Sequence, residues 1–526
     1  MVENRKFPFG DRSGEVRSRK KGSGRELRKR AELRPLPGFG AAPPFGQENS
    51  TKNRLLYHPL QIHRTAIFTL ILAGVALLSA LIAPQIASSS RLSPLFLVAI
   101  FGLVAVLIIL QMPILGIVGL IPAALMFPVS LSTGTGSGLN GAILLLLLLI
   151  GLWMLDMIAR QHQVRLLNSR SVIVSIVFGV IALVSFLFGQ YSWYPTNSAP
   201  LAAQIAGLMM YILSIGTVLL VGHQVNSIRG LQWMTGVFLA IGSVYIIARF
   251  IPPFQRNIYE VFARHATLGC LFYVWFAAIG VSQAIFNHEL SRWLRYAIGG
   301  MMLAVAYLNL GESRFWMSGW LPALVGVTAI LVLAKPRFGI WVVSISAILI
   351  IINTQVVDTL MSEGDNAYST LTRLEAWKVM FQLIKTNPIF GLGMANYYWY
   401  THLYPILGYS VSFSSHNNYI DLVAQTGLIG LIGFFWLMGE LGWLGWKLKS
   451  VVPEGFPRAY VYGAIGGLAG TLFAGLLGDW FIPFVYNIGL EGFRASMLAW
   501  LFLGGLLVLE KLYITPSGDQ PRGFTE

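Results

Sequence analysis

The chain of 526 residues is 55% hydrophobic and only 11% charged. Soluble domains carry about 25% charged residues, so this composition excludes an ordinary soluble protein and predicts a polytopic membrane protein. The formal net charge of +15 does not indicate nucleic-acid binding, because the positive charge gathers in the N-terminal tail and in short loops between apolar stretches. Cys270 is the only cysteine, which excludes an intrachain disulfide.

The N-terminal segment, residues 1–64, holds fifteen Lys and Arg residues against six Asp and Glu residues. It also contains Pro and Gly clusters such as Arg34-Pro35-Leu36-Pro37-Gly38, and little in it could form a core. We therefore predict a mostly disordered basic tail. The tail is expected on the cytoplasmic side, where it is either simply solvated or attracted to anionic lipid headgroups.

From residue 65 to about 510 the sequence predicts an all-α, polytopic transmembrane helical bundle of about fourteen spans. Each predicted span is long enough to cross a hydrocarbon core of roughly 30 Å. The spans are predicted near 65–84, 94–111, 113–131, 141–158, 171–189, 201–221, 231–249, 265–285, 295–311, 316–334, 338–356, 416–445, 459–478 and 484–509. A cytoplasmic tail, 511–526, follows them.

Loop charge predicts the orientation of these spans. If the basic tail is cytoplasmic, the inner loops hold most of the loop Lys and Arg residues: Arg160, Arg165, Arg170, Arg229, Arg292, Arg295, Lys335, Arg337, Lys447, Lys449 and Arg458. The predicted outer loops 128–140 and 190–200 hold none. This asymmetry follows the positive-inside rule and predicts that both termini are cytoplasmic.

Residues 357–415 form the longest predicted extracytoplasmic loop. Within it, Ser369 to Lys385 alternates apolar and charged residues in a pattern that predicts an amphipathic helix near the membrane surface. Asn387-Pro388 and the glycines that follow end this helix. Trp and Tyr crowd residues 397–409, as in an interfacial aromatic belt.

His416 stands where a polar stretch enters the apolar run that ends near Trp446. A polar entry before a long apolar run predicts a helix N-terminus. A histidine at such a boundary can titrate near neutral pH and act as a general base. The alternative is that His416 caps the helix or forms an interfacial hydrogen bond.

Arg314 and Arg373 are positive residues on the predicted outer side, where the topology disfavours them. Arginine's planar guanidinium suits bidentate binding of phosphate, so both are candidates for an anionic substrate site. The alternative is that they extend toward lipid headgroups or pair with Glu312 or Glu375.

Other charged residues carry weaker indications. Arg249, Arg256 and Arg264 flank an outer loop and either widen an anionic site or anchor the interface. Glu363-Gly364-Asp365 is the one acidic pair that resembles a metal-binding motif, and we expect it to be solvated, with no metal site in the protein. Asp479 is expected to face outward as a structural partner.

The ordered set of motifs across 310–435 resembles the O-antigen ligase and O-antigen polymerase family of bacterial membrane proteins. The resemblance is carried by Ser313-Arg314 between two spans, Arg373 with Trp377, Pro388-Ile389-Phe390-Gly391-Leu392-Gly393, His416-Asn417-Asn418-Tyr419-Ile420, and the glycines Gly427 and Gly430. The long basic tail and the high span count depart from the family pattern.

The resemblance implies a metal-independent glycosyltransferase without cofactors on the outer face of the cytoplasmic membrane, acting in cell-envelope polysaccharide biosynthesis such as that of lipopolysaccharide. The donor would be a glycan on a polyprenyl diphosphate, such as undecaprenyl diphosphate, and the acceptor a hydroxyl on a lipid, glycan or protein. It assigns the diphosphate to Arg314 and Arg373 and activation of the acceptor to His416. We add Asn417 and Arg264 as further candidate substrate-binding residues. Ligation, polymerisation and protein glycosylation stay open at this stage, as do the sugar and the oligomeric state.

Two other functions compete with this interpretation. Arginines within a helical bundle could also bind the substrate of a secondary transporter of a small anion, although such sites usually lie near the bilayer midplane. A purely structural role would not require charges at one face. The clustering at one predicted face favours the enzyme.

Overall fold

The structure is a computed structural model, and it describes residues 106–128, 130–132, 138–312, 316–352 and 366–515. The predicted basic tail, 1–64, and the predicted span 65–84 lie outside these residues. The described helices are α3 (Pro113–Leu125), α4 (Gly141–Leu155), α5 (Arg170–Phe188), α6 (Leu201–Gln224), α7 (Ile228–Arg249), α8 (Pro252–Val261), α9 (Arg264–Thr267), α10 (Cys270–Phe286), α11 (Arg292–Tyr307), α12 (Met317–Ala334), α13 (Pro336–Ile352), α15 (Asn366–Ile384), α16 (Asn396–Tyr400), α17 (Asn418–Val451), α18 (Phe456–Leu477) and α19 (Gly489–Tyr513).

The described chain is overwhelmingly helical, as predicted. Short π-helical turns follow α4 (Asp156–Arg160) and α11 (Leu308–Glu312), and a 3-10 turn follows α16 (Thr401–Leu403). The exception is a pair of short antiparallel strands, β1 (Ser130–Ser132) and β2 (Gly138–Asn140), in the segment predicted as an outer loop. The structure is therefore that of an all-α polytopic protein with one small hairpin.

Among the described residues, eight helices are long and apolar enough to cross a membrane. They are Gly141–Arg160, Arg170–Phe188, Leu201–Gln224, Ile228–Arg249, Met317–Ala334, Asn418–Val451, Phe456–Leu477 and Gly489–Tyr513. Three shorter apolar helices accompany them: Pro113–Leu125, Cys270–Phe286 and Pro336–Ile345. Each predicted span from 113–131 onward overlaps a helix, but the count of fourteen spans is not confirmed.

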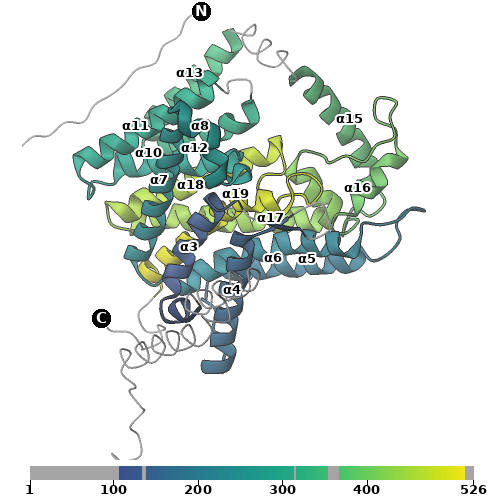
Figure 1. Cartoon of the computed structure of the whole chain (residues 1–526), viewed down its shortest axis with the longest axis horizontal. Coiled ribbons are helices and arrows are strands. Elements are labelled where there is room, and N and C mark those ends of the chain that lie inside the picture. The colour runs from purple at the N-terminus through teal and green to yellow at the C-terminus, as the bar shows by residue number, and fades with distance from the viewer. Residues whose placement is uncertain (1–105, 129, 133–137, 313–315, 353–365, 516–526) are drawn as a thin grey trace, which may run out of the picture. The chain divides into compact units, whose positions relative to one another are not determined.

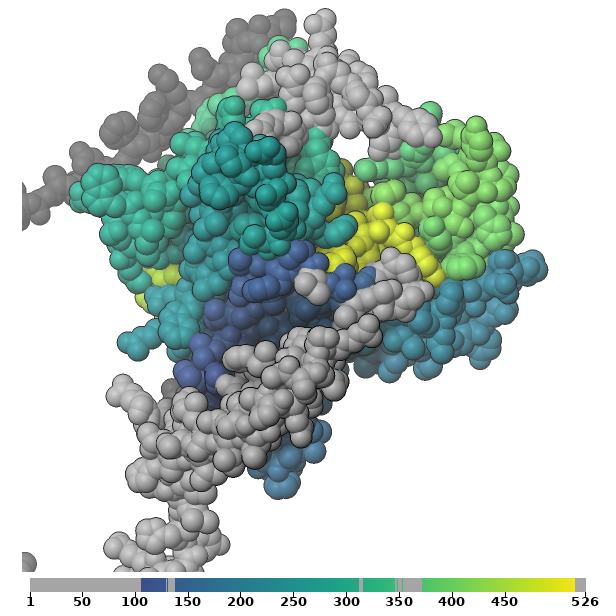
Figure 2. Space-filling model, viewed as in Figure 1, coloured from purple at the N-terminus to yellow at the C-terminus, as the bar shows by residue number. Residues whose placement is uncertain are grey.

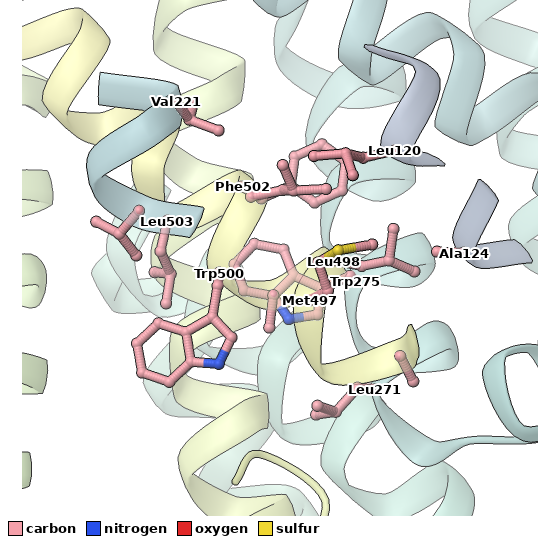
Figure 3. Close-up of a cluster of buried hydrophobic side chains, with 14 of the residues drawn as sticks. Leu120, Ala124, Val221, Leu271, Trp275, Met497, Leu498, Trp500, Phe502 and Leu503 are labelled. Carbon is pink, nitrogen blue, oxygen red and sulfur yellow. The ribbon is translucent and has the colours of Figure 1, made fainter. Parts of the chain in front are cut away.

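Helix α19 lies at the centre of the bundle, and its apolar stretch is completely buried. A helix that is apolar on every side is one that other helices surround, and the packing agrees. Figure 3 shows Trp500, Phe502 and Leu498 of α19 among side chains of α3, α6 and α10. The ring of Phe502 stacks on Trp275 of α10, with centroids 5.5 Å apart.

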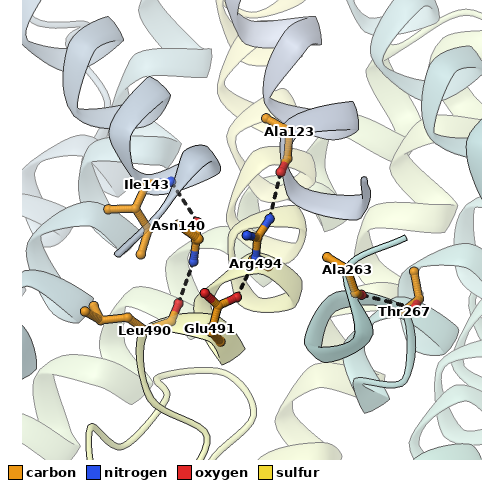
Figure 4. Close-up of polar contacts among 8 residues, drawn as sticks. All are labelled: Ala123, Asn140, Ile143, Ala263, Thr267, Leu490, Glu491 and Arg494. Carbon is orange, nitrogen blue, oxygen red and sulfur yellow. Dashed lines mark hydrogen bonds and ion pairs between the residues drawn. The ribbon is translucent and has the colours of Figure 1, made fainter. Parts of the chain in front are cut away.

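Polar groups fix the N-terminal end of α19. Arg494 is fully buried, and its Nε donates to Glu491 Oε2 at 2.7 Å while Nη1 donates to the carbonyl oxygen of Ala123 at 3.0 Å (Figure 4). Asn140, the N-cap of α4, donates to the carbonyl oxygen of Leu490 at 2.9 Å. These contacts tie α3 and α4 to the start of the central helix.

Small residues allow α18 to pack closely against α10 and α12. A Cβ atom added at Gly466 would lie 2.7 Å from the carbonyl oxygen of Gly326, and one added at Gly470 would lie 2.6 Å from that of Pro322. Glycines four residues apart on one helix let two backbones approach, a common arrangement in membrane helices. The close contact with α12 and α10 holds the C-terminal end of α18 in place.

Helix α17 is interrupted at Gly427, whose φ of 69° and ψ of −174° are not helical. The segment Pro388–Gly393 lies in the break. The amides of Leu428 and Ile429 donate to the carbonyl oxygens of Pro388 and Ile389, and the carbonyl oxygens of Ala424 and Gln425 accept from the amides of Leu392 and Gly393. Every backbone group that the break frees at these positions is satisfied, as a low-dielectric surrounding requires.

Candidate functional site

The candidate site lies at the end of the bundle where α17 begins and α18 ends, which we call the site end. Helix α15 spans Asn366–Ile384, close to the predicted Ser369 to Lys385. Its Ala376, Val379, Met380 and Leu383 are buried against a small aromatic core. Figure 1 shows α15 and α16 together at one side of the bundle, and Figure 2 shows the same green segment as a distinct surface region.

Arg373 of α15 is half-buried and reaches the C-terminus of α18. Its Nη1 donates to the carbonyl oxygen of Leu477 at 3.2 Å. A guanidinium at a helix C-terminus satisfies a free carbonyl and complements the helix dipole. One turn later, Trp377 donates through Nε1 to the carbonyl oxygen of Ser415 at 2.9 Å. One face of α15 therefore holds both the end of α18 and the residue before His416.

His416 has a left-handed backbone, with φ of 51°, which is uncommon for a residue with a side chain. The helix begins only at Asn418, and Asn417 is its N-cap: its Oδ1 accepts from the amides of Tyr419 and Ile420. The structure thus assigns the capping role to Asn417, and His416 lies outside the helix. The Nδ2 of Asn417 also donates to the carbonyl oxygen of Leu476 at 3.1 Å.

A buried hydrogen-bond network supports the turn at His416. The Oγ of Ser415 donates to Asp421 Oδ1 at 2.6 Å and accepts from the amide of Asn417 at 3.0 Å. Tyr397 of α16 donates to the same carboxylate oxygen at 2.5 Å. Strained backbone persists only where the surrounding contacts determine it, and these contacts do so on both sides of His416.

Asp479, in the loop between α18 and α19, is the third charged group of the site. It is only 2% exposed. Its Oδ2 accepts from the amide of Phe484 at 2.9 Å, and its Oδ1 accepts from Asn487 Nδ2 at 2.5 Å. The same Asn487 nitrogen lies 3.3 Å from His416 Nδ1, with roles that depend on the tautomer of the imidazole. Asn487 thereby links the carboxylate to the histidine.

The three groups perturb one another electrostatically. Burial among protein groups lowers the pKa of His416 below its ordinary value, although part of the residue stays exposed; Asp479 opposes this shift and Arg373 adds to it. Burial also lowers the pKa of Arg373, and Asp479 opposes that shift. Burial raises the pKa of the Asp479 carboxyl, against the effect of its hydrogen bonds and of His416. Together with the hydrogen bonds of Arg373 and Asn417 to the end of α18 and of Asn487 to Asp479, these effects place the three groups near one another.

The structure brings together three of the predicted site residues: Arg373, His416 and Asn417. Arg264, at the start of α9, is exposed, and its guanidinium carbon lies 5.9 Å from the centroid of the Tyr259 ring. In the described part of the chain, no hydrogen bond or ion pair joins Arg264 to Arg373 or His416. Arg314 lies outside the described residues, so its place stays a prediction.

The sequence interpretation did not include Asp479 and Asn487 among the site residues. It predicted Asp479 on the outer side as a structural partner, and the structure shows that its buried carboxylate accepts a hydrogen bond from Asn487. The available signal was a charged residue in a short loop between two apolar spans. The same kind of signal marked Arg314.

No group of three or more His, Cys, Asp or Glu side chains suited to hold a metal ion occurs in the described ranges. The acidic pair Glu363 and Asp365 lies outside them.

Comparison with known proteins gives a family match. Residues 299–435 match a family model described as O-Antigen ligase. No curated protein matches the chain. The matched residues include Arg373, His416, Asn417 and the Pro388–Gly393 segment in the break of α17, and they support a membrane enzyme of polysaccharide biosynthesis. The resemblance drawn from the sequence motifs is confirmed: residues 299–435 match the O-antigen ligase family model.

Proposed function

We propose that the protein is a membrane glycosyltransferase that moves a glycan from a polyprenyl-diphosphate carrier to an acceptor hydroxyl. The reaction would occur at the outer face of the cytoplasmic membrane, with the site end of the bundle facing outward. The observation that carries the proposal is the joint placement of Arg373, His416 and Asp479 within an O-antigen ligase region and the loop packed against it.

The chemistry requires one bond to break and one to form at the anomeric carbon of the donor sugar. The acceptor oxygen bonds to that carbon, the bond from the carbon to the diphosphate oxygen breaks, and the diphosphate leaves with the bonding electron pair. Its negative charge grows in the transition state, where a guanidinium is most stabilising. Arg373 is proposed to take this role, and Arg314 is proposed to share it.

The proton of the acceptor hydroxyl needs an acceptor of its own. The imidazole of His416 has a lowered pKa and is therefore largely neutral at pH 7, so its unprotonated nitrogen can take this proton. The resulting imidazolium would be stabilised by the negative charge of Asp479, which raises the pKa of His416.

The test is transfer from purified undecaprenyl-diphosphate glycan, measured beside donor binding. His416→Ala should lower turnover by roughly 10²–10⁴-fold, because it removes the base, and should leave donor binding nearly unchanged. His402→Ala is the matched control, since His402 is a half-buried histidine of the same outer segment without a place in the site. Activity is expected to survive EDTA.

Near-normal turnover of a well-inserted His416→Ala variant would show that His416 is not the general base. Loss of activity in EDTA that Mg²⁺ or Mn²⁺ restores would move the chemistry to a metal held by residues such as Glu363 and Asp365.

A further inference from the structure

A cluster of aromatic side chains adjoins the site and has no role in the chemistry above. Tyr486 directly precedes Asn487, the residue that links Asp479 to His416. Tyr398 and Trp399 of α16 contact Tyr486 from the opposite segment, and all three residues are half-exposed. The cluster therefore includes the sequence neighbour of the residue that contacts the proposed base.

The contacts hold these rings in fixed orientations. Tyr398 and Tyr486 stack with centroids 4.6 Å apart and an interplanar angle of 21°. The indole Nε1 of Trp399 donates to the Tyr486 hydroxyl at 2.9 Å. These contacts give the three rings a defined mutual geometry.

Buried side chains next to the aromatic cluster hold it in place. Tyr397 is fully buried and stacks on Phe484, with centroids 4.5 Å apart and an angle of 17°. The hydroxyl of Tyr397 donates to Asp421, which also holds Ser415 next to His416. The aromatic cluster and the turn that presents His416 thus share one support, and their relative position is fixed.

We propose that Tyr398, Trp399 and Tyr486 form a stacking wall for a sugar ring of the acceptor glycan. A pyranose presents C–H groups on its faces and hydroxyls at its rim. The C–H groups suit the negative face of an aromatic ring, and the phenol and indole edges suit the hydroxyls.

The choice of the acceptor rests on the proposed function. The acceptor hydroxyl must reach His416, and Tyr486 directly precedes Asn487, whose side-chain nitrogen lies 3.3 Å from His416 Nδ1. Arg373, the residue proposed to bind the donor diphosphate, contacts the carbonyl oxygen of Leu477 and, within the described part of the chain, none of the three rings. We therefore assign the wall to the acceptor.

The experiment measures binding of a panel of methyl hexopyranosides to the full-length detergent-solubilised protein by saturation-transfer NMR. We expect saturation of the sugar ring protons, with binding weakened roughly fivefold to tenfold in Tyr486→Leu and little changed in Tyr486→Phe, which keeps the ring. Tyr409→Leu is the matched control: Tyr409 lies in the same segment and is 71% exposed. Binding of undecaprenyl diphosphate should be equal in all variants.

If the wild-type protein binds none of the methyl hexopyranosides, or if Tyr486→Leu binds them as well as the wild type does, the proposed stacking wall is contradicted. Equal losses in Tyr486→Leu and Tyr409→Leu would favour interfacial anchoring instead, and a loss of diphosphate binding would assign the wall to the donor. If Tyr486→Leu does not fold, Tyr398→Leu decides by the same criteria. Because this readout needs no transfer, it can succeed or fail independently of the proposed glycosyltransferase activity.

Discussion

At the scale of single residues, His416 combines an exposed ring, a left-handed backbone and a fixed polar neighbour. The left-handed backbone places His416 just outside helix α17, and the hydrogen bonds of Ser415 and Asn417 on either side fix that backbone. The lowered pKa follows from the protein groups around the ring and from Arg373, with Asp479 acting against them.

The pH dependence of transfer follows from these signs. Only the neutral imidazole accepts a proton, so kcat/KM should fall with decreasing pH along a limb centred below about 6.5, the ordinary histidine pKa. Asp479→Asn removes a negative charge that raises the histidine pKa, so the limb should move to still lower pH. The measurement is a pH–rate profile of both proteins, and an upward shift in Asp479→Asn would contradict the assignment.

Arg373 offers a second test at this scale. Arg373→Ala should weaken donor binding and lower turnover by roughly 10²-fold or more, because it removes charge stabilisation from the leaving group. Arg373→Lys should restore only part of both, since an ammonium keeps the charge but loses the bidentate guanidinium.

Lys378→Ala is the control on the same helix, where Lys378 is exposed and pairs with Glu375 at 2.6 Å. Full rescue by lysine would mean that charge alone matters at position 373. Equal effects at 373 and 378 would mean that general electrostatics governs donor binding.

At the scale of elements, a short loop segment stabilises the break in α17 through backbone hydrogen bonds. Segment Pro388–Gly393 exchanges backbone hydrogen bonds with the two ends of the break, so α15, α16 and the first turns of α17 are held as one body beside the site. A glycine is required at 427 because its φ is positive and because a Cβ atom there would lie 2.0 Å from the carbonyl oxygen of Ile389.

Gly427→Ala is therefore expected to destabilise the protein by about 2 kcal/mol or more, from backbone strain and steric overlap. Gly439→Ala, in the same helix, is the matched control: nothing lies within 4 Å of an added Cβ atom there, and alanine favours the helix. The thermal midpoint of the detergent-solubilised protein should fall for the first variant and stay equal or rise slightly for the second. Equal midpoints would show that the break is not required for stability.

At the scale of the whole molecule, the orientation in the membrane decides whether the site can meet an outward-facing lipid-linked donor. Cys270 is the only cysteine of the chain and is buried, so the native protein offers little background for thiol labelling. This makes single engineered cysteines informative reporters of sidedness.

Ser410→Cys, in the exposed segment at the site end, should react with a membrane-impermeant maleimide in intact spheroplasts. Glu454→Cys, in the exposed turn between α17 and α18, should react only after permeabilisation. The reverse pattern would place the site in the cytoplasm and would contradict transfer at the outer face.

The sequence alone determined the membrane class, the approximate positions of the long apolar helices from residue 113 onward and the family region. These features are local: a helix that crosses a bilayer needs a long apolar run, and that run is visible in the sequence. Arg373 and His416 were also singled out as candidates from the sequence, because charged or titratable groups are conspicuous beside apolar spans on the predicted outer side.

Only the tertiary structure decided how these residues meet their partners. The link from Asp479 through Asn487 to His416 joins the loop after α18 to the start of α17, and it depends on the close packing of α18 that returns its end to the site. Arg264 carries the same charge as Arg373, yet α9 holds it beside Tyr259 instead. Contacts between segments far apart in the chain are set by the packing of whole helices, and no local pattern of residues encodes them.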